Sequence, residues 1–220
     1  MKFAPITLAM MTLIARAAIA EEPAHEHMDD DPLRAFVLVD RLEWQSGGAD
    51  DRLAWEVDGW IGKDANRLWL RTEGERAGDS TEWSALEALW GRSIARWWDL
   101  VAGVRHDFEP GTSRNWAALG VVGIAPYDFE VKLTGYLGER ATTAFQASAE
   151  IDLLLTRRWI MQPRIEAAWW GNSTTAEGVA GIRLRYEIRR ELAPYAGLEW
   201  QRPFEGRDAL RVVAGLRAWL

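Results

Sequence analysis

Short segments that alternate apolar and polar residues repeat along most of this chain of 220 residues. In the segment 209–219 the even-numbered residues are apolar, whereas Arg211 and Arg217 occupy odd positions. In the segment 178–189 two arginines and a glutamate alternate with apolar residues in the same way. Successive side chains of a β-strand point to opposite faces, so a period of two predicts strands with one apolar and one charged face.

The predicted strands follow one another from Leu33 to the end of the chain, and about twelve of them have membrane-spanning length. Tight turns and longer loops rich in Gly, Ser, Thr and Asp alternate between them. Consecutive strands joined in this way are antiparallel neighbours, so the sequence predicts an all-β fold. The predicted strands span 33–46, 52–62, 66–76, 81–92, 96–108, 114–125, 128–139, 142–155, 158–170, 178–189, 192–201 and 209–219.

Tryptophan is unusually frequent, with 14 in the chain, and most lie near the ends of predicted strands. Aromatic rings gather at the two membrane–water interfaces, where an apolar ring and a polar N–H are both satisfied. A sugar-binding groove or a Trp-rich core would also use tryptophan, but neither needs it at both ends of repeated strands. The predicted belt beside the loops holds Trp44, Trp83, Trp116, Trp169, Trp170 and Trp200, and the belt beside the turns holds Trp90, Trp97, Trp98, Trp159 and Trp219.

The charged faces of the strands decide which way each face points. They carry too many acids and bases for a dry core, since an unpaired buried charge is costly. The simplest arrangement directs apolar residues outward to lipid and charged residues into a polar lumen. The sequence therefore predicts a transmembrane antiparallel β-barrel of about twelve strands, of the kind found in bacterial outer membranes. Alternation is imperfect in the first strand, where a β-bulge is expected near Asp40.

The first 32 residues differ from the rest of the chain. Residues 1–20 have a positive start, an apolar run and a small-residue cleavage site, which together predict a signal peptide. Residues 21–32 are acidic and lack large apolar groups, which predicts a disordered leader. The barrel is then expected to occupy residues 33–220. The chain has no cysteine, so a closed barrel rather than disulfides would stabilise this exported protein.

The inward faces should be electronegative, because the predicted lumenal acids outnumber the bases. A surplus of carboxylates lowers the barrier to positive ions and predicts a cation path. The alternative is that acids and bases pair into a network that simply fills the lumen. The net charge of −7 argues against nucleic acid as a partner. The carboxylates expected to contact a metal ion in the lumen are Glu43, Glu56, Asp58, Glu73, Glu87, Asp99 and Asp107.

The leader holds a second set of candidate metal ligands. His25, His27 and Met28 lie within four residues of one another, among several acids. Imidazole nitrogen suits Cu(II) and a thioether suits Cu(I), so this cluster offers ligands to both oxidation states of copper. A third, weaker candidate is His106 beside Asp107, at the rim of the predicted barrel.

Catalysis is not expected. Barrel enzymes that cleave or transfer acyl groups need a nucleophile with a nearby base and an orienting group. His106 is the only histidine in the predicted barrel, and the sequence has no G-x-S-x-G element. The sequence therefore favours a protein that is not an enzyme.

Several segments together resemble the copper resistance protein B family. The acidic leader with its His and Met residues precedes the barrel, and the most recognisable segments are VDRLEW at 39–44, VDGWIG at 57–62, LWLRTEGE at 68–75, RHDFEPG at 105–111, EAAWWG at 166–171 and RLRYEIRRELAPYAGLEW at 183–200. The similarity covers essentially the whole chain after the signal peptide. One departure is the leader, because family members often carry a long run of Met/His motifs and this chain has only His25, His27 and Met28.

The resemblance implies a copper-binding protein of the Gram-negative outer membrane that acts in copper resistance and homeostasis. It implies copper as a bound or transported ion rather than a catalytic cofactor, and a leader on the periplasmic side. The acidic lumen then predicts passage of copper ions through the barrel. The alternative is a non-conducting barrel, set in outer-membrane lipid, that anchors periplasmic copper-handling partners such as a multicopper oxidase.

Overall fold

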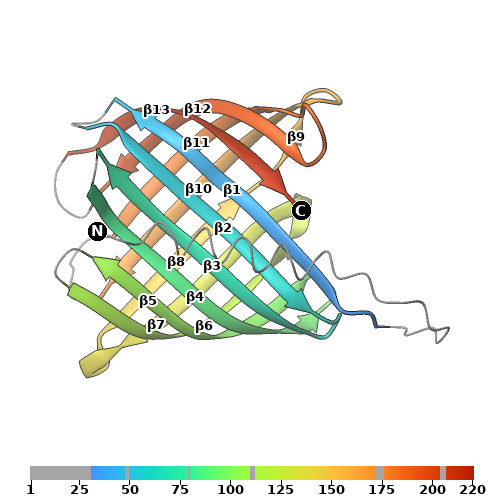
Figure 1. Ribbon diagram of the computed structural model, residues 1–220, viewed down its shortest axis with the longest axis vertical. Coiled ribbons are helices and arrows are strands. Elements are labelled where there is room, and N and C mark those ends of the chain that lie inside the picture. The colour runs from blue at the N-terminus through green and yellow to red at the C-terminus, as the bar shows by residue number, and fades with distance from the viewer. Residues whose placement is uncertain (1–30, 48–49, 79, 110–111, 172–175, 204–206) are drawn as a thin grey trace.

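The strands form one antiparallel sheet that closes on itself into a barrel (Figure 1). The computed structural model describes residues 31–47, 50–78, 80–109, 112–171, 176–203 and 207–220. Neighbours in the chain are neighbours in the sheet, and the last strand pairs with the first to complete the circle. Within these residues no helix is both long and apolar enough to cross a bilayer.

The bounds of the strands follow the predicted alternation closely. The strands are β1 (Arg34–Ser46), β2 (Arg52–Gly62), β3 (Asn66–Ala77), β4 (Ser80–Ala95), β5 (Trp98–Glu109), β6 (Thr112–Ala125), β7 (Phe129–Gly138), β8 (Thr143–Glu150), β9 (Leu153–Leu154), β10 (Trp159–Trp170), β11 (Glu177–Tyr186), β12 (Leu192–Arg202) and β13 (Ala209–Trp219). Two short 3-10 turns, η1 (Pro126–Asp128) and η2 (Glu139–Ala141), flank β7.

One predicted strand, 142–155, is interrupted, and it appears as β8 and the two-residue β9. Both pair with β10, one after the other, so the circumference is that of a 12-strand barrel and the predicted count is confirmed. The ladder breaks opposite Pro163, which has no N–H to donate to the facing strand. Pro163 still accepts a hydrogen bond from the N–H of Ile151 at 3.2 Å.

The barrel has two unlike ends. We call the end where β1 begins and β13 finishes the turn end, because the long connections 171–176 and 203–208 lie at the other end. That other end also has two-residue connections at 78–79 and 110–111, where longer loops were predicted. We call the opposite end, where β1 finishes and β2 begins, the loop end. The first strand residue of the chain, Arg34, and the last, Trp219, therefore both lie at the turn end.

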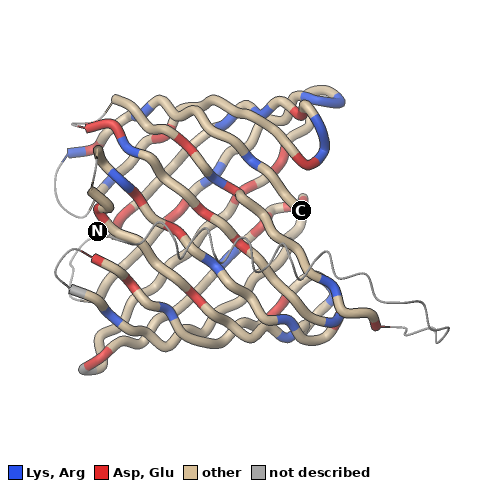
Figure 2. Tube along the Cα trace, in the orientation of Figure 1, with Lys and Arg blue, Asp and Glu red and all other residues tan. Residues whose placement is uncertain are grey.

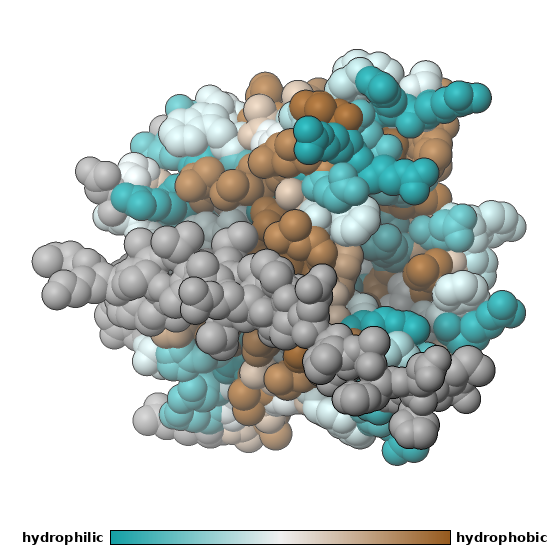
Figure 3. All heavy atoms as spheres, turned by 45° about the vertical axis from the view of Figure 1, so that its right-hand side comes forward, coloured by the Kyte–Doolittle hydropathy of each residue, from teal (hydrophilic) through white to brown (hydrophobic). Residues whose placement is uncertain are grey.

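Apolar side chains cover the outside of the barrel and charged side chains fill the inside. Mid-strand residues of the outer face such as Val104, Leu119 and Ile165 are each 61% exposed. By contrast, Glu43 is fully buried, and Glu199 is 1% exposed. Figure 3 shows apolar side chains gathered around the middle of the wall in view, with hydrophilic ones toward both ends. The predicted orientation is therefore confirmed, since a soluble barrel would have the reverse arrangement.

The irregular first strand contains the expected bulge. Val39 lies opposite Val57 of β2, but the next paired residue is Arg41, so Asp40 has no partner in that ladder. Because of the extra residue, Leu38 and Arg41 lie on the same face of the strand, although strict alternation along the sequence places them on opposite faces. Asp40 is 6% exposed, and its carboxylate contacts two lumenal arginines.

The tryptophans lie on both faces of the barrel wall. Trp44 and Trp97 are outward and more than half exposed, at 52% and 58%, as the two-belt prediction requires. Trp116, however, is 4% exposed and points into the lumen, where its indole N–H donates to Asp107 at 2.7 Å and its ring contacts Trp170. Those two tryptophans are thus lumenal packing residues rather than members of an outer belt. The same correction applies to Trp219, which shares the inward face of β13 with Arg217.

Candidate functional site

Charged side chains line the lumen from strands all around the barrel, and Figure 2 shows acids and bases interspersed along both walls. They form a belt of ion pairs across the middle of the lumen. Toward the loop end the belt opens into a wide vestibule. Toward the turn end, the inner wall carries a row of aromatic rings in which Phe36 lies 6.1 Å from Trp219 and 6.3 Å from Trp60.

Arg164 of β10 is the centre of the belt. Its guanidinium contacts four carboxylates: Asp40 at 3.0 Å, Glu56 at 2.7 Å, Glu150 at 3.2 Å and Glu166 at 2.5 Å. These acids come from β1, β2, β8 and β10, so one side chain ties distant parts of the wall together. Arg164 is 6% exposed, and such a buried cation requires the hydrogen bonds that these acids accept.

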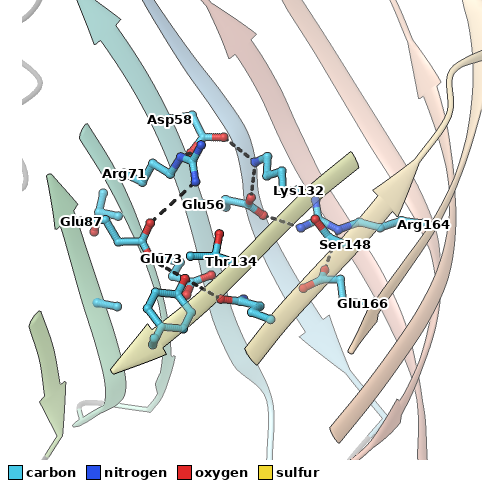
Figure 4. A pocket seen from close by; sticks show the side chains of 14 residues that line it. Glu56, Asp58, Arg71, Glu73, Glu87, Lys132, Thr134, Ser148, Arg164 and Glu166 are labelled. Carbon is cyan, nitrogen blue, oxygen red and sulfur yellow. Dashed lines mark hydrogen bonds and ion pairs between the residues drawn. The ribbon is translucent and has the colours of Figure 1, made fainter. Parts of the chain in front are cut away.

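Lys132 of β7 is the second cation at the centre (Figure 4). Its ammonium lies 3.0 Å from a carboxylate oxygen of Glu56 and 2.5 Å from one of Asp58. Arg71 completes this part of the belt with looser contacts, 3.6 Å to Asp58 and 3.7 Å to Glu87. Glu56 and Asp58 stand two residues apart on β2, which places both carboxylates on the lumenal face.

Arg105 of β5 organises an adjoining cluster, with acids from β3, β4 and β5. Its guanidinium contacts Glu73 at 2.8 Å, Glu87 at 3.1 Å and Asp107 at 2.6 Å. The hydroxyl of Tyr136 donates to Glu87 at 2.7 Å. The acids predicted to contact a metal ion in this region are therefore engaged by an arginine and a tyrosine.

A further cluster surrounds Glu43, which is fully buried. Arg183 donates to both of its oxygens, at 3.1 and 3.0 Å, and also contacts Glu199 at 2.6 Å. The hydroxyl of Tyr195 and the amide of Gln45 donate to Glu43 at 2.9 and 2.8 Å. This paired fork is the geometry in which arginine binds carboxylates most strongly.

The free space in the lumen is very uneven. Within the belt a gap of about 50 Å³ remains, lined by residues that include Glu56, Lys132 and Arg164. One water requires roughly 10–15 Å³ of such space, so the gap holds only a few water molecules. The vestibule at the loop end measures about 950 Å³ and includes Glu75 and Glu109 in its lining. The lumen is thus accessible from the loop end and narrow at its centre.

The predicted lumenal carboxylates do face the lumen, but each contacts a cation. Asp99, nearer the turn end, contacts Arg67 at 2.9 Å. Within the described residues, no three His, Cys, Asp or Glu side chains are grouped so that they could hold a metal ion. The other predicted ligands, His25, His27 and Met28, lie outside the residues that the structure describes.

The sequence missed several lumenal cations. Arg41 contacts Glu56 at 2.9 Å and Glu166 at 3.3 Å, and it shares its face of β1 with Glu43, which the sequence did predict to be lumenal. Arg52 and Arg67 also point inward from strand ends, where they contact Glu75 and Asp99. Continuing the alternation of β2 and β3 to their ends would have revealed both. These arginines reduce the acidic surplus that the sequence suggested.

His106 and Asp107 do not form a joint site. They are consecutive in β5, so their side chains point to opposite faces of the wall. A ring nitrogen of His106 hydrogen-bonds the amide oxygen of Asn115 on the outer face at 2.6 Å, whereas Asp107 is buried in the lumen beside Arg105.

The apolar outside, the charged inside and the closed antiparallel sheet define a β-barrel of the outer-membrane type. Two solved structures share the fold. The NanC porin aligns with a TM-score of 0.59 at 11% identity, covering 85% of this chain and 100% of that one. An outer membrane channel from Pseudomonas putida F1 aligns with a TM-score of 0.54 at 9% identity, covering 90% of this chain and 100% of that one.

The sequence comparisons identify the family. The family model described as "Copper resistance protein B precursor (CopB)" matches residues 33–220. "Copper resistance protein B" of Escherichia coli is 40% identical over 223 residues, which cover 93% of this chain and 75% of that protein. "Copper resistance protein B homolog" of Pseudomonas syringae pv. tomato is 38% identical over 224 residues, covering 93% and 76%. The chain belongs to the copper resistance protein B family, which confirms the resemblance found in the sequence.

Proposed function

We propose that this protein resides in the outer membrane of a Gram-negative bacterium and binds copper ions as part of copper resistance. The observation that carries the proposal is a lumen lined with carboxylates that opens at the loop end into a vestibule of about 950 Å³. Carboxylate-lined cavities attract cations, and Cu(II) binds such oxygen donors more tightly than its neighbouring divalent metals. The proposed role is binding and passage of an ion, with no catalytic step.

Passage through the lumen is the second part of the proposal. Copper ions would enter the vestibule, whose lining acids include Glu75, Glu82, Glu109 and Glu177. They would then advance along the buried carboxylates Glu43, Glu56, Asp58, Glu73, Glu87, Asp107 and Asp99. The gap of about 50 Å³ at the centre requires the ion pairs of the belt to rearrange during this step.

The same narrow centre favours a second candidate function. A belt held by many ion pairs suits a barrel that conducts nothing and serves as an outer-membrane anchor for periplasmic copper-handling partners, such as a multicopper oxidase. Uptake of Cu(II) by vesicles that contain the protein and a trapped copper-sensitive dye separates the two functions. Copper entry above that of protein-free vesicles supports passage, and its absence supports the anchor.

The leader is proposed to add a copper site at the periplasmic mouth. Residues 1–20 would be removed on export, leaving His25, His27 and Met28 near the new N-terminus. Their nitrogen and sulfur atoms would capture copper or transfer it to a partner. The exposed ring of His106, hydrogen-bonded to Asn115, is at most a single additional ligand on the outer wall.

Neutralising the vestibule is expected to lower copper binding. The test is copper bound per protein, measured by elemental analysis on the mature protein, with zinc as the reference metal. The triple variant Glu75→Gln, Glu82→Gln, Glu109→Gln is expected to bind less copper, because it removes three negative charges from the vestibule and so weakens its attraction for cations. A matched control removes three exposed acids outside the vestibule, Asp128→Asn, Glu139→Gln and Glu191→Gln, and should retain it.

Deleting residues 21–32 shows whether the bound copper is held by the leader or by the barrel. If binding survives this deletion and falls in the vestibule variant, the barrel itself binds copper. If binding disappears with the leader and is unchanged in the vestibule variant, the barrel acts as an anchor. Copper no greater than zinc in every protein would contradict the proposed function.

A further inference from the structure

Lys132 is an exception among the lumenal cations. In the described part of the lumen, the other cations that form the ion pairs are arginines. A guanidinium is a rigid planar fork that holds carboxylates in fixed geometry, whereas an ammonium is a compact point charge on a flexible four-carbon stem. Lys132 is therefore the residue of the belt that carries a compact positive charge on a flexible side chain.

Like Arg164, which reaches Glu56 of β2 from β10, Lys132 bridges the lumen rather than pairing with a residue of a neighbouring strand. Its partners Glu56 and Asp58 belong to β2, which is not a neighbour of β7 in the sheet. The contacts, at 3.0 and 2.5 Å, join residues separated by 76 and 74 positions in the sequence. Figure 4 shows the lysine reaching across toward both carboxylates.

Each of the two carboxylates has a second cationic neighbour besides the lysine, although only Glu56 is hydrogen-bonded to it. The second oxygen of Glu56 accepts hydrogen bonds from Arg164 at 2.7 Å and Arg41 at 3.0 Å. The second oxygen of Asp58 lies 3.6 Å from Arg71. If the ammonium moved away, one oxygen of each acid would still point toward the position that Lys132 had occupied.

This position adjoins the vestibule. The central gap and the vestibule share Glu73, Gln146 and Glu166 in their linings, so the gap continues the vestibule inward. Lys132 lines the gap and not the vestibule. An ion that advanced from the loop end would therefore meet the ammonium at the narrow centre.

We infer that Lys132 is a tethered cation that closes the central lumen, bound between Glu56 and Asp58 where a mobile cation would otherwise sit. A cation passes this point only when the ammonium leaves and its charge is replaced. The closure also sets selectivity, because the vacated position is bounded by two carboxylates and repels anions. The inference deepens the proposed function and rests on its passage step.

Potassium conductance tests the inference without copper. Single-channel and bulk conductance are measured in planar bilayers with KCl for the natural protein, Lys132→Met and Lys132→Arg. Lys132→Met preserves most of the side-chain volume and removes the charge, so conductance is expected to rise by roughly tenfold, with reversal potentials that indicate cation selectivity. Lys132→Arg retains a cation and is expected to conduct no more than the natural protein.

A second variant links the effect to the two acids. Lys132→Met combined with Glu56→Gln and Asp58→Asn should lose the cation selectivity of Lys132→Met. Folding of each variant is checked by its heat-dependent shift on a gel, and Lys132→Gln replaces Lys132→Met if the latter does not fold. Unchanged conductance in a folded Lys132→Met or Lys132→Gln barrel would overturn the inference, as would a rise without cation selectivity.

The conductance test can succeed or fail independently of the proposed copper function. A conducting Lys132→Met barrel in a protein that binds no copper would support the tethered cation and contradict the copper role. If the protein binds copper but its Lys132→Met variant does not conduct potassium, the copper role is supported and the tethered cation is contradicted.

Discussion

Replacing Arg164 by methionine is expected to lower the free energy of unfolding by about 3–5 kcal/mol, the range found when one partner of a buried ion pair is removed. The reason is that Asp40, Glu56, Glu150 and Glu166 all accept hydrogen bonds from this one guanidinium, at distances of 2.5 to 3.2 Å. Methionine retains much of the side-chain length, so packing changes little and the loss reports the uncompensated acids. Urea unfolding of the barrel in lipid vesicles, followed by tryptophan fluorescence, measures the difference.

An exposed arginine provides the control. Arg34 forms a single ion pair with Asp64 at 2.9 Å, in which the two side chains are 57% and 61% exposed. Exposed pairs contribute about 0–1 kcal/mol, so Arg34→Met should leave stability nearly unchanged. If both variants unfold at the same urea concentration as the natural protein, the belt does not stabilise the barrel. The charges of the belt would then act only in the passage of ions and not in stability.

Most of the fold could be predicted from the sequence, because a barrel in a membrane imposes a strict period of two. The second predicted strand, 52–62, coincides with β2 (Arg52–Gly62). The observed strand bounds differ from the predicted ones where the pairing of neighbouring strands, rather than the alternation in the sequence, determines where a strand ends. β4 extends to Ala95 because Ala95 still pairs with Trp98 of β5. β11 ends at Tyr186, short of the predicted 189, because its partner β10 begins at Trp159.

The site was less predictable than the fold. Alternation states that Glu56 faces the lumen, but not which cation it meets there. Its partners Lys132 and Arg164 lie 76 and 108 positions away in the sequence, and only the closure of the barrel brings them together. Counting inward acids against inward bases therefore indicated an electronegative lumen and left open whether its charges form a cation path or a paired network. The structure shows nearly every predicted acid paired.

This pairing changes how the copper role must be argued. A lumen with free carboxylates would bind cations at its centre without any movement, but here arginines and a lysine already hold those positions. The vestibule at the loop end, which includes Glu75, Glu82 and Glu109, is the part of the barrel wide enough to receive an ion. Binding in the vestibule and passage through the belt are thus separate properties, and variants of the two regions should separate them.

Placing an arginine at the centre of the outer face is expected to destabilise the barrel strongly. Ile165 lies near the middle of β10 and is 61% exposed, directly after the inward-facing Arg164. If this face contacts the hydrocarbon core, Ile165→Arg should lower the free energy of unfolding in lipid by about 2–4 kcal/mol, the cost of a cation at the bilayer midplane. The same urea titration in vesicles measures it.

The matched control carries the same substitution at a strand end. Leu210 is 60% exposed and is the second residue of β13, directly before the inward-facing Arg211, so it lies on the outer face near the loop end. An arginine there reaches the interface with its charged group, so Leu210→Arg should cost only about 0–1 kcal/mol. The difference between the two arginines measures the depth of each position in the membrane and is independent of side-chain type. Equal and small effects at both positions would mean that water covers the middle of the wall, which contradicts a membrane-spanning barrel.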